Sequence, residues 1–223
     1  IDNARMPAAK MVDYLDTMNV GGNGASLTWR DSIAILTVNT MMGMDTIEQI
    51  FAAYREIDEK KASGLIIDLR TNNGGAFAVK PLVSHLIQVP LDAGIFISQP
   101  WTKLHERLPN QKEISQQVPW SGWSIKSFWS DAQNNAITRI QFQPTAPYFN
   151  KPVYVLTSKK TASAAELATD ALSNINNVTI VGEITAGQML SQKMYDLSHG
   201  LQLALPIADY YAVNSGSNVT LAS

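Results

Sequence analysis

The stretch GLIIDLRTNNGG, residues 64–75, runs from an apolar segment directly into a glycine-rich turn. An apolar run followed at once by turn-forming residues is typical of a buried strand that ends abruptly. Gly74 and Gly75 carry no side chain, so the backbone there can bend sharply and leave its N–H groups uncovered. Because a helical pattern begins at residue 76, the stretch predicts a strand–turn–helix unit, which by itself is most simply a tight connection.

A second unit of the same kind lies in TSKKTASAAELATDAL, residues 157–172. The apolar run 153–158 predicts a strand, and residues 162–174 predict a helix with Ser163 at its beginning. A serine at this position is usually a helix cap. The same position also suits a nucleophile, because the positive end of the helix and its uncovered N–H groups stabilise an oxyanion. The segment alone leaves both interpretations open.

The remaining chain alternates between strand and helix patterns. We expect helices at 6–18, from about residue 46 with Asp45 as its cap, and at 76–89 with a kink at Pro81. Further strands are expected at the following places: two within 25–39, then 94–98, 178–183, 201–207 and 209–213. Alternating strands and helices predict an α/β fold with helices packed on a largely parallel sheet.

Residues 99–150 differ from the rest of the chain in composition and pattern. They contain four of the five tryptophans: Trp101, Trp120, Trp123 and Trp129. The segment shows little periodicity apart from one predicted strand at 137–143, so we interpret it as an insertion or lid. Simple core packing would explain the tryptophans equally well.

Composition excludes several classes of function. The chain has 223 residues, a net charge of −2 and no cysteine. Without a basic stripe a nucleic-acid partner is not expected, and without cysteine there is neither thiol catalysis nor a cysteine metal site. The Asp, Glu and His residues are dispersed, so we expect no metal and no cofactor. No apolar run reaches the roughly 18 residues of a membrane span.

Three segments in the right order resemble the tail-specific, or C-terminal processing, serine peptidases, whose relatives include the tricorn core and interphotoreceptor retinoid-binding protein. The family pattern D-L-R-x-N-x-G-G is matched at 68–75, and T-A-S-A-[SA]-E at 161–166. The pattern V-G-x-x-T-x-G is matched at 181–187, with Gln192 five residues later. The resemblance covers roughly residues 30–98 and 150–207.

The resemblance implies a crotonase/ClpP-like ββα superhelical fold with a largely parallel sheet. It implies that Ser163 is the nucleophile and that N–H groups of Gly74 or Gly75, and of Ala164, form the oxyanion hole. Together with the residue patterns, it leads us to expect an N-terminal helical segment at 1–24 and a peptidase-like catalytic domain at 25–223 that carries the tryptophan-rich insertion at about 99–150.

Other residues of the matched segments have supporting roles in this interpretation. Asp68, Arg70 and Glu166 are expected to brace the site rather than react. Gln192 is included among the catalytic-site residues because it belongs to the third matched segment.

One position departs from the family pattern. The general base of the processing peptidases is a lysine 25 residues after the serine, and this chain has Gln188 there. A neutral amide cannot accept a proton from a hydroxyl near pH 7. The tricorn-type branch uses a histidine on an early strand, but 32–39 contains none and Thr37 lies about where it would be.

Other groups are weaker candidates for the base. The three histidines are His85, His105 and His199, and each is most simply a helix-face or surface residue. A lid could nevertheless bring His105 to the serine. Lys193 is next to Gln192 but should face the opposite way on a strand, and Lys159 and Lys160 are expected to lie on the surface of the turn before Ser163.

The resemblance therefore implies a serine-type endopeptidase for extended polypeptide, with Gln188 as a reason to expect reduced activity. The alternative is a non-catalytic homologue that binds peptides or apolar ligands, with the aromatic segment lining its pocket. Acyl-CoA chemistry on the same fold is disfavoured by the matched motifs, and an α/β-hydrolase by the absence of G-x-S-x-G around Ser163. The resemblance and the lack of cysteine lead us to expect an extracytoplasmic location.

Overall fold

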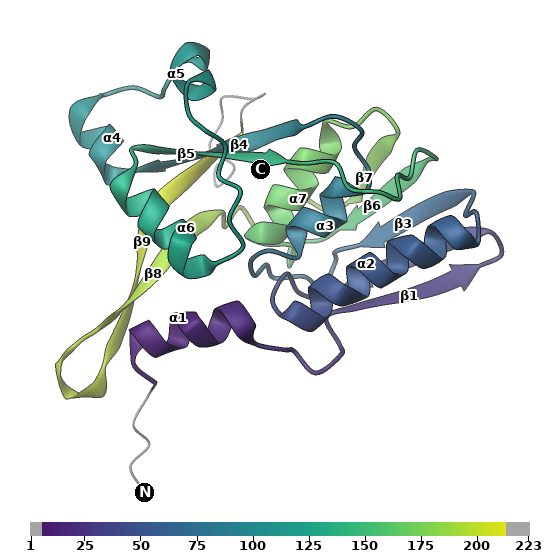
Figure 1. The fold of residues 1–223 in the computed structure, drawn as a ribbon, viewed down its shortest axis with the longest axis horizontal. Helices are drawn as coiled ribbons and strands as arrows, with labels where there is room; N and C mark the ends of the chain where they lie inside the picture. The colour runs from purple at the N-terminus through teal and green to yellow at the C-terminus, as the bar shows by residue number, and fades with distance from the viewer. Residues whose placement is uncertain (1–5, 213–223) are drawn as a thin grey trace, which may run out of the picture.

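A five-stranded, mostly parallel sheet forms one half of the molecule (Figure 1). The computed structural model describes residues 6–212. The sheet consists of five strands in this spatial order: β1 (Ala25–Arg30), β2 (Ile33–Val38), β3 (Gly64–Asp68), β6 (Val153–Thr157) and β7 (Val178–Gly182). Only β1 runs antiparallel to its neighbour. The predicted α/β class with a largely parallel sheet is confirmed.

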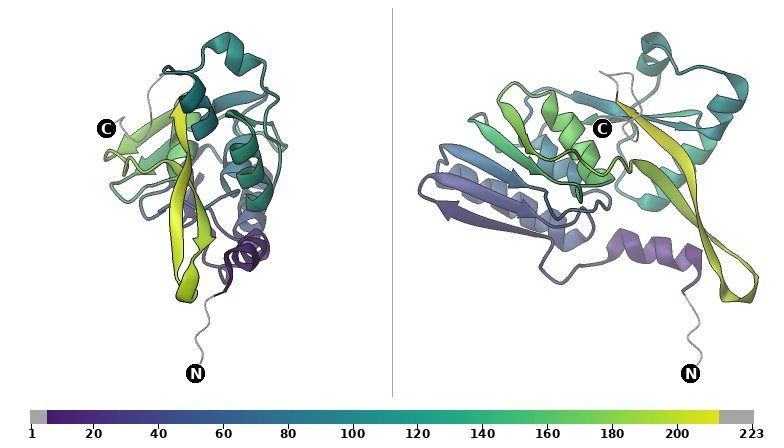
Figure 2. Two further views of the ribbon diagram at one scale, coloured as in Figure 1. Left: turned by 90° about the vertical axis from the view of Figure 1, so that its left-hand side faces the viewer. Right: turned by 180° about the vertical axis from the view of Figure 1, so that it is seen from behind.

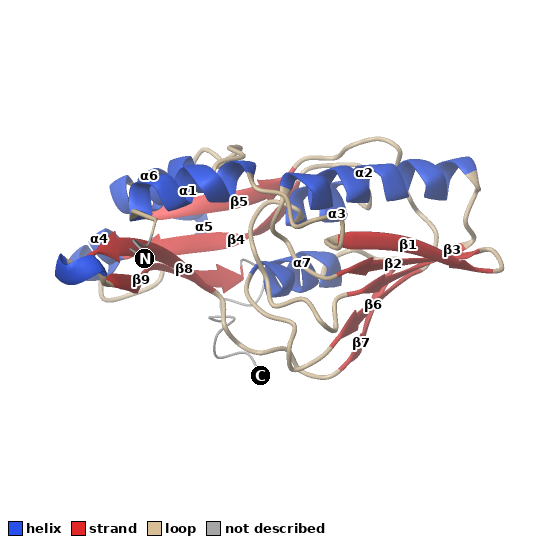
Figure 3. Cartoon of the chain, turned by 90° about the horizontal axis from the view of Figure 1, so that it is seen from below, coloured by secondary structure: helices blue, strands red, loops and turns tan. Residues whose placement is uncertain are grey.

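The strands of this sheet form because their aliphatic side chains are covered by helices. Leu36, Leu65 and Ile67 are fully buried, as expected for parallel strands that are shielded by crossover helices. Helix α2 (Met44–Glu59) lies along one side of the sheet in Figure 3 and buries Ile50 and Ile57. Helix α7 (Ala164–Ser173) follows β6 and is almost entirely apolar on its buried side.

A second sheet, which the sequence did not predict, forms the other half. It is antiparallel, with the order β5 (Ile137–Phe142), β4 (Leu91–Ser98), β9 (Gln202–Ala212) and β8 (Leu190–Asp196). The two strands expected at 201–207 and 209–213 are one continuous strand, β9; residue 213 lies outside the described residues. The β8–β9 hairpin projects from the body beside α1 (Ala8–Thr17), as Figure 2 shows.

Residues 99–150 fold against the second sheet. They form α4 (Gln99–Leu104), α5 (Gln111–Ser115), α6 (Ile125–Asn134) and the expected strand β5. Trp101 is buried in a small apolar cluster with Ile95, Ile114 and Ile137. The segment is therefore more regular than its weak periodicity indicated. The proposed division at residue 24 stays a prediction.

Two details of the predicted helices were wrong. Helix α3 is confined to Val79–Ser84, and Pro81 lies in its first turn, where a missing N–H does not break a helical bond. Asp45 is not the cap of α2, because Gly43 holds that position. Instead the Asp45 carboxylate accepts hydrogen bonds from the N–H groups of Val20 and Gly22, at 2.9 Å each, which fixes the preceding turn.

Candidate active site

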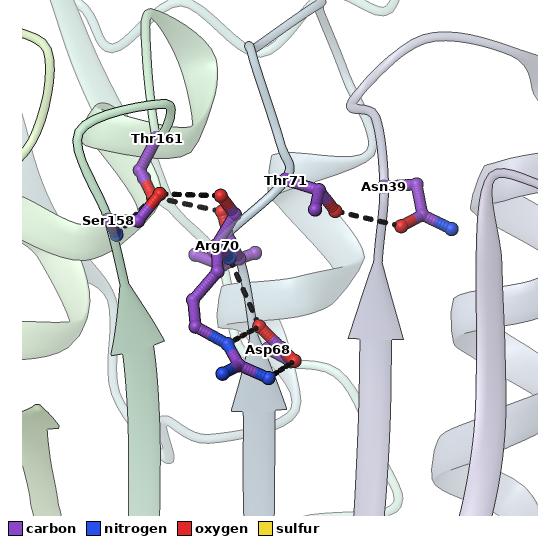
Figure 4. Close-up of polar contacts among 7 residues, drawn as sticks. Asn39, Asp68, Arg70, Thr71, Ser158 and Thr161 are labelled. Carbon is purple, nitrogen blue, oxygen red and sulfur yellow. Dashed lines mark hydrogen bonds and ion pairs between the residues drawn. The ribbon is translucent and has the colours of Figure 1, made fainter. Parts of the chain in front are cut away.

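The turns that follow β3 and β6 meet at the same edge of the parallel sheet and are joined by hydrogen bonds (Figure 4). Ser158 Oγ donates to the Arg70 carbonyl oxygen at 2.6 Å, and Thr161 Oγ1 donates to the Leu69 carbonyl oxygen at 2.9 Å. Ala162 N donates to the Asn72 carbonyl oxygen at 3.1 Å. The two matched segments thus form one continuous unit.

Asp68 and Arg70 brace the first turn, as expected. The guanidinium of Arg70 donates from Nε and Nη2 to the two carboxylate oxygens of Asp68, at 2.9 and 2.7 Å (Figure 4). These bonds lower the pKa of Asp68 below its ordinary value. Neither residue lines the cavity described below. Their role is to shape the turn, and the exposed arginine makes their ion pair a modest source of stability.

Asn72 is fully buried and holds the backbone of the glycine turn. Its Nδ2 donates to the Val38 carbonyl oxygen at 3.0 Å, and its Oδ1 accepts from Gly74 N at 2.9 Å. Gly74 has φ +103°, and a Cβ there would lie 2.6 Å from the Cβ of Ser163. Glycine is therefore required both for the backbone conformation and for the close approach of the two segments.

Ser163 has a backbone conformation that L-residues rarely adopt, with φ 54° and ψ −123°. Within residues 6–212 the other non-glycine residues with positive φ are all exposed: Asp31, Lys61 and His199. Ser163 is half-buried and immediately precedes α7. Strain of this kind at a buried turn is characteristic of functional sites, where the surrounding structure enforces it.

Two backbone N–H groups beside Ser163 are free to bind a ligand. Neither Gly75 N nor Ala164 N donates a hydrogen bond to any residue within 6–212. Gly74 N, by contrast, is engaged by Asn72. The structure therefore selects Gly75 over Gly74 as the glycine whose N–H is available.

Glu166 ties Ser163 to the loop that contains Gln188. Its buried carboxylate, 1% exposed, accepts four hydrogen bonds and faces no cation among the described residues. Oε2 accepts from Ser163 N at 2.8 Å and Gln188 N at 2.9 Å. Oε1 accepts from Thr185 Oγ1 at 2.8 Å and Gly187 N at 2.7 Å. All four donors are neutral, which is consistent with the bracing role expected for Glu166.

A cavity of about 670 Å³ opens beside these groups. Ser163, Gly75, Ala164, Gln188 and Gln192 all line it, so the structure brings together every predicted site residue except Gly74. Most of the remaining lining is apolar and includes these aromatic side chains: Phe77, Phe96, Trp120, Phe128, Trp129 and Phe142. The size and lining are those of a site for a small molecule or a peptide segment.

The candidate bases that the sequence offered do not reach the serine. The ring of His105 lies tilted against that of Trp101 with centroids 4.0 Å apart, His85 is buried against Tyr54, and His199 lies in the β8–β9 turn. None of them lines the cavity, and neither do Thr37 and Lys193. Within residues 6–212, no histidine, lysine or carboxylate is hydrogen-bonded to Ser163 Oγ. No group of three metal-ligating side chains occurs in that range either.

Lys80 is a cavity residue that the sequence analysis missed. Its Nζ donates to the carbonyl oxygens of Ser121 at 3.0 Å and Gly122 at 2.6 Å, and lies over the rings of Trp120 and Trp123. Burial lowers its pKa to about 8. The available signal was a single cation inside the apolar run AFAVKPLV, residues 76–83.

Comparison with known proteins gives one family match. Residues 32–220 match the model described as peptidase family S41. The carboxyl-terminal-processing protease of Synechocystis sp. is 31% identical over 163 residues, which are 73% of this chain and 30% of that protein. CtpB of Bacillus subtilis, a carboxy-terminal processing protease, is 23% identical over 184 residues, 82% of this chain and 31% of that protein. The chain thus spans about a third of the length of the curated relatives it matches.

Two solved structures share the fold. The photosystem II D1 C-terminal processing protease aligns with a TM-score of 0.60 and 20% identity over 92% of this chain and 42% of that chain. Mature CPAF complexed with lactacystin aligns with a TM-score of 0.60 and 18% identity over 87% of this chain and 47% of that chain. No helix within residues 6–212 is long and apolar enough to cross a membrane.

Proposed function

The chain belongs to peptidase family S41, and from that membership we propose that it is a serine-type peptidase acting on extended polypeptide. One observation supports the proposal above all others. Ser163 is held in a strained conformation at the beginning of α7, and it lines a cavity together with two unengaged backbone N–H groups. A nucleophile of acyl transfer needs this combination, because the attacked carbonyl oxygen becomes negatively charged.

The proposed reaction begins with attack of Ser163 Oγ on the carbonyl carbon of a peptide bond. The carbonyl oxygen then carries the negative charge and accepts hydrogen bonds from Gly75 N and Ala164 N. Removing one such donor typically costs about 3 kcal/mol of transition-state stabilisation. The amine leaves with a proton, and water subsequently hydrolyses the acyl-serine.

Proton removal from Ser163 is the weak step in this proposal. Gln188 lines the cavity, but its amide has no basic lone pair at neutral pH. The Ser163 proton therefore passes to water, and the rate should be low. We assign Gln192, which also lines the cavity, to contact with the substrate backbone rather than to proton transfer.

The test compares the parent chain with Ser163→Ala and Gln188→Lys on an unfolded, casein-like substrate over hours. We expect slow cleavage by the parent, none by Ser163→Ala, and a rise of ~100-fold or more in Gln188→Lys, the usual gain from a positioned base. Cleavage that persists in Ser163→Ala would refute the assignment of the nucleophile. Rapid cleavage by the parent would show that another base operates.

A binding role is the second candidate, and the apolar, aromatic cavity without a basic partner for Ser163 favours it. If neither the parent nor Gln188→Lys cleaves, while both bind an apolar peptide, the binding role replaces the peptidase role. We also propose an extracytoplasmic location. The proposal is supported by the resemblance of the chain to the C-terminal processing peptidases and by the absence of cysteine.

A further inference from the structure

The cavity beside Ser163 has one charged side chain in its lining. Among the described residues that line it, Lys80 alone is ionisable, and the other polar members are neutral amides and hydroxyls. Aromatic and aliphatic side chains make up most of the wall. A single cation in such surroundings gives the cavity an apolar interior with one fixed positive charge.

The ammonium of Lys80 is incompletely satisfied. An ammonium group has three donors, and Lys80 uses two of them for the carbonyl oxygens of Ser121 and Gly122. No Asp or Glu within residues 6–212 forms an ion pair with it. A partly buried charge without a counter-charge is unfavourable, so a negatively charged ligand group would stabilise it.

The position of Lys80 is fixed by its helix at the backbone and by aromatic rings at the ammonium group. It belongs to α3, which directly follows the Gly75 turn. Its Nζ lies 4.9 Å from the ring centroid of Trp120 and 4.4 Å from that of Trp123, and Phe77 stacks on Trp120 at 5.5 Å. These contacts immobilise the side chain, so little entropy would be lost when it binds a ligand.

We propose that Lys80 binds a carboxylate of the substrate, so that the cavity selects apolar peptide segments carrying one negative charge. The inference rests on the proposed peptidase function, because it names the substrate class of the same cavity. The carboxylate comes either from a free peptide C-terminus or from an Asp or Glu side chain. Both sources offer the same two oxygen acceptors to the ammonium of Lys80.

The experiment measures binding by calorimetry in the Ser163→Ala background, in which no peptide is cleaved. Four acetylated apolar peptides of equal length are compared: one with a free C-terminus, the same peptide amidated, and two amidated peptides with a central Glu or Gln. We expect one charged peptide to bind ~10-fold more tightly than its neutral partner, equivalent to about 1.4 kcal/mol. The pair that shows the difference identifies the source of the carboxylate.

Replacing Lys80 distinguishes a role in binding the ligand from a purely structural role, in which Lys80 only connects α3 to the loop that contains Ser121 and Gly122. In Lys80→Met the charged and neutral peptides should bind within about twofold of each other, because the counter-charge is gone. Lys193→Met is the matched control, since Lys193 also makes a hydrogen bond and lies over an aromatic ring but does not line the cavity. It should keep the full preference. If Lys80 had only the structural role, Lys80→Met would bind the charged and the neutral peptide of each pair more weakly by the same factor.

Three results would overturn the inference: equal binding of charged and neutral peptides by the unsubstituted cavity, an unchanged preference in Lys80→Met, or loss of preference in Lys193→Met. If Lys80→Met does not fold, Lys80→Gln replaces it. The comparison of charged and neutral peptides on the Ser163→Ala protein with Lys80 in place also tests the inference. Casein cleavage by the parent chain is measured separately. Cleavage without charge preference would refute only this inference, and charge preference without cleavage would refute only the peptidase proposal.

Discussion

The two walls of the cavity are built in different ways. The wall that contains Ser163 consists of two turns at one sheet edge, held by buried polar groups such as Asn72 and Glu166. The opposite wall comes from residues 99–150 and the second sheet, and it is held by aromatic packing of Trp120 and Phe128. The first wall positions backbone atoms accurately, whereas the second provides shape and apolar surface. Substitutions in the two walls should therefore have different consequences.

The largest effect is expected on the polar wall, at Glu166. Glu166→Ala removes the acceptor of four hydrogen bonds and leaves buried donors unsatisfied, so the free energy of unfolding should fall by roughly 3–5 kcal/mol. Urea unfolding measures this change. Glu183→Ala, at an exposed glutamate, should stay within about 0.5 kcal/mol of the parent. Equal losses in both variants would mean that the carboxylate network does not hold this wall.

A smaller and more selective effect is expected on the aromatic wall. Trp120→Leu should weaken binding of an apolar peptide to the Ser163→Ala protein by about 5–10-fold, because part of the apolar lining is lost. Trp101 is a tryptophan of the same segment that lies outside the cavity and donates to the Arg107 carbonyl oxygen at 2.7 Å. Trp101→Leu should lower stability without changing affinity. A similar affinity loss in both variants would refute the division into walls.

The smallest effect concerns pH and a residue that belongs to neither wall. Burial lowers the pKa of His85, whose Nδ1 lies 2.9 Å from the Pro147 carbonyl oxygen and whose ring stacks on Tyr54. Below the ordinary histidine pKa of about 6.5, the unfolded chain binds a proton that the folded chain resists. The contribution of His85 to the free energy of unfolding should therefore be fully present above that pH. It should decrease as the pH is lowered from the ordinary pKa towards the lower pKa of the folded chain.

The variant His85→Asn, which keeps a side-chain donor but does not titrate, provides the control for this prediction. Its urea midpoint should depend less steeply on pH than that of the parent between pH 7 and 5. An identical pH dependence would show that His85 does not contribute to it.

The sequence was most informative where local chemistry determines structure. The strand that ends at Asp68 and the serine at the beginning of α7 were both predicted, because apolar runs, glycines and helix starts are short-range signals. The selection of Gly75 over Gly74 was beyond the sequence, because it depends on the side chain of Asn72 folding back onto Gly74 N.

The second sheet shows what the sequence could not predict. Its neighbouring strands β4 and β9 are separated by more than 100 positions of sequence, so no local pattern indicates their pairing. The place of Lys80 in the cavity could not be predicted for the same reason, since its partners Ser121 and Gly122 come from a distant loop. Pocket walls assembled from remote segments require the three-dimensional structure.

The attachment of residue 188 has an evolutionary consequence. Glu166 holds this position through its backbone N–H, and the side chain of Gln188 makes no hydrogen bond within the described part of the chain. The contact that the structure shows at this position is therefore made by the backbone and not by the side chain, and proline, which has no N–H, would lose it. A change from glutamine to lysine needs a single nucleotide substitution, so an amine can be gained or lost at this position while the contact between its backbone and Glu166 is kept.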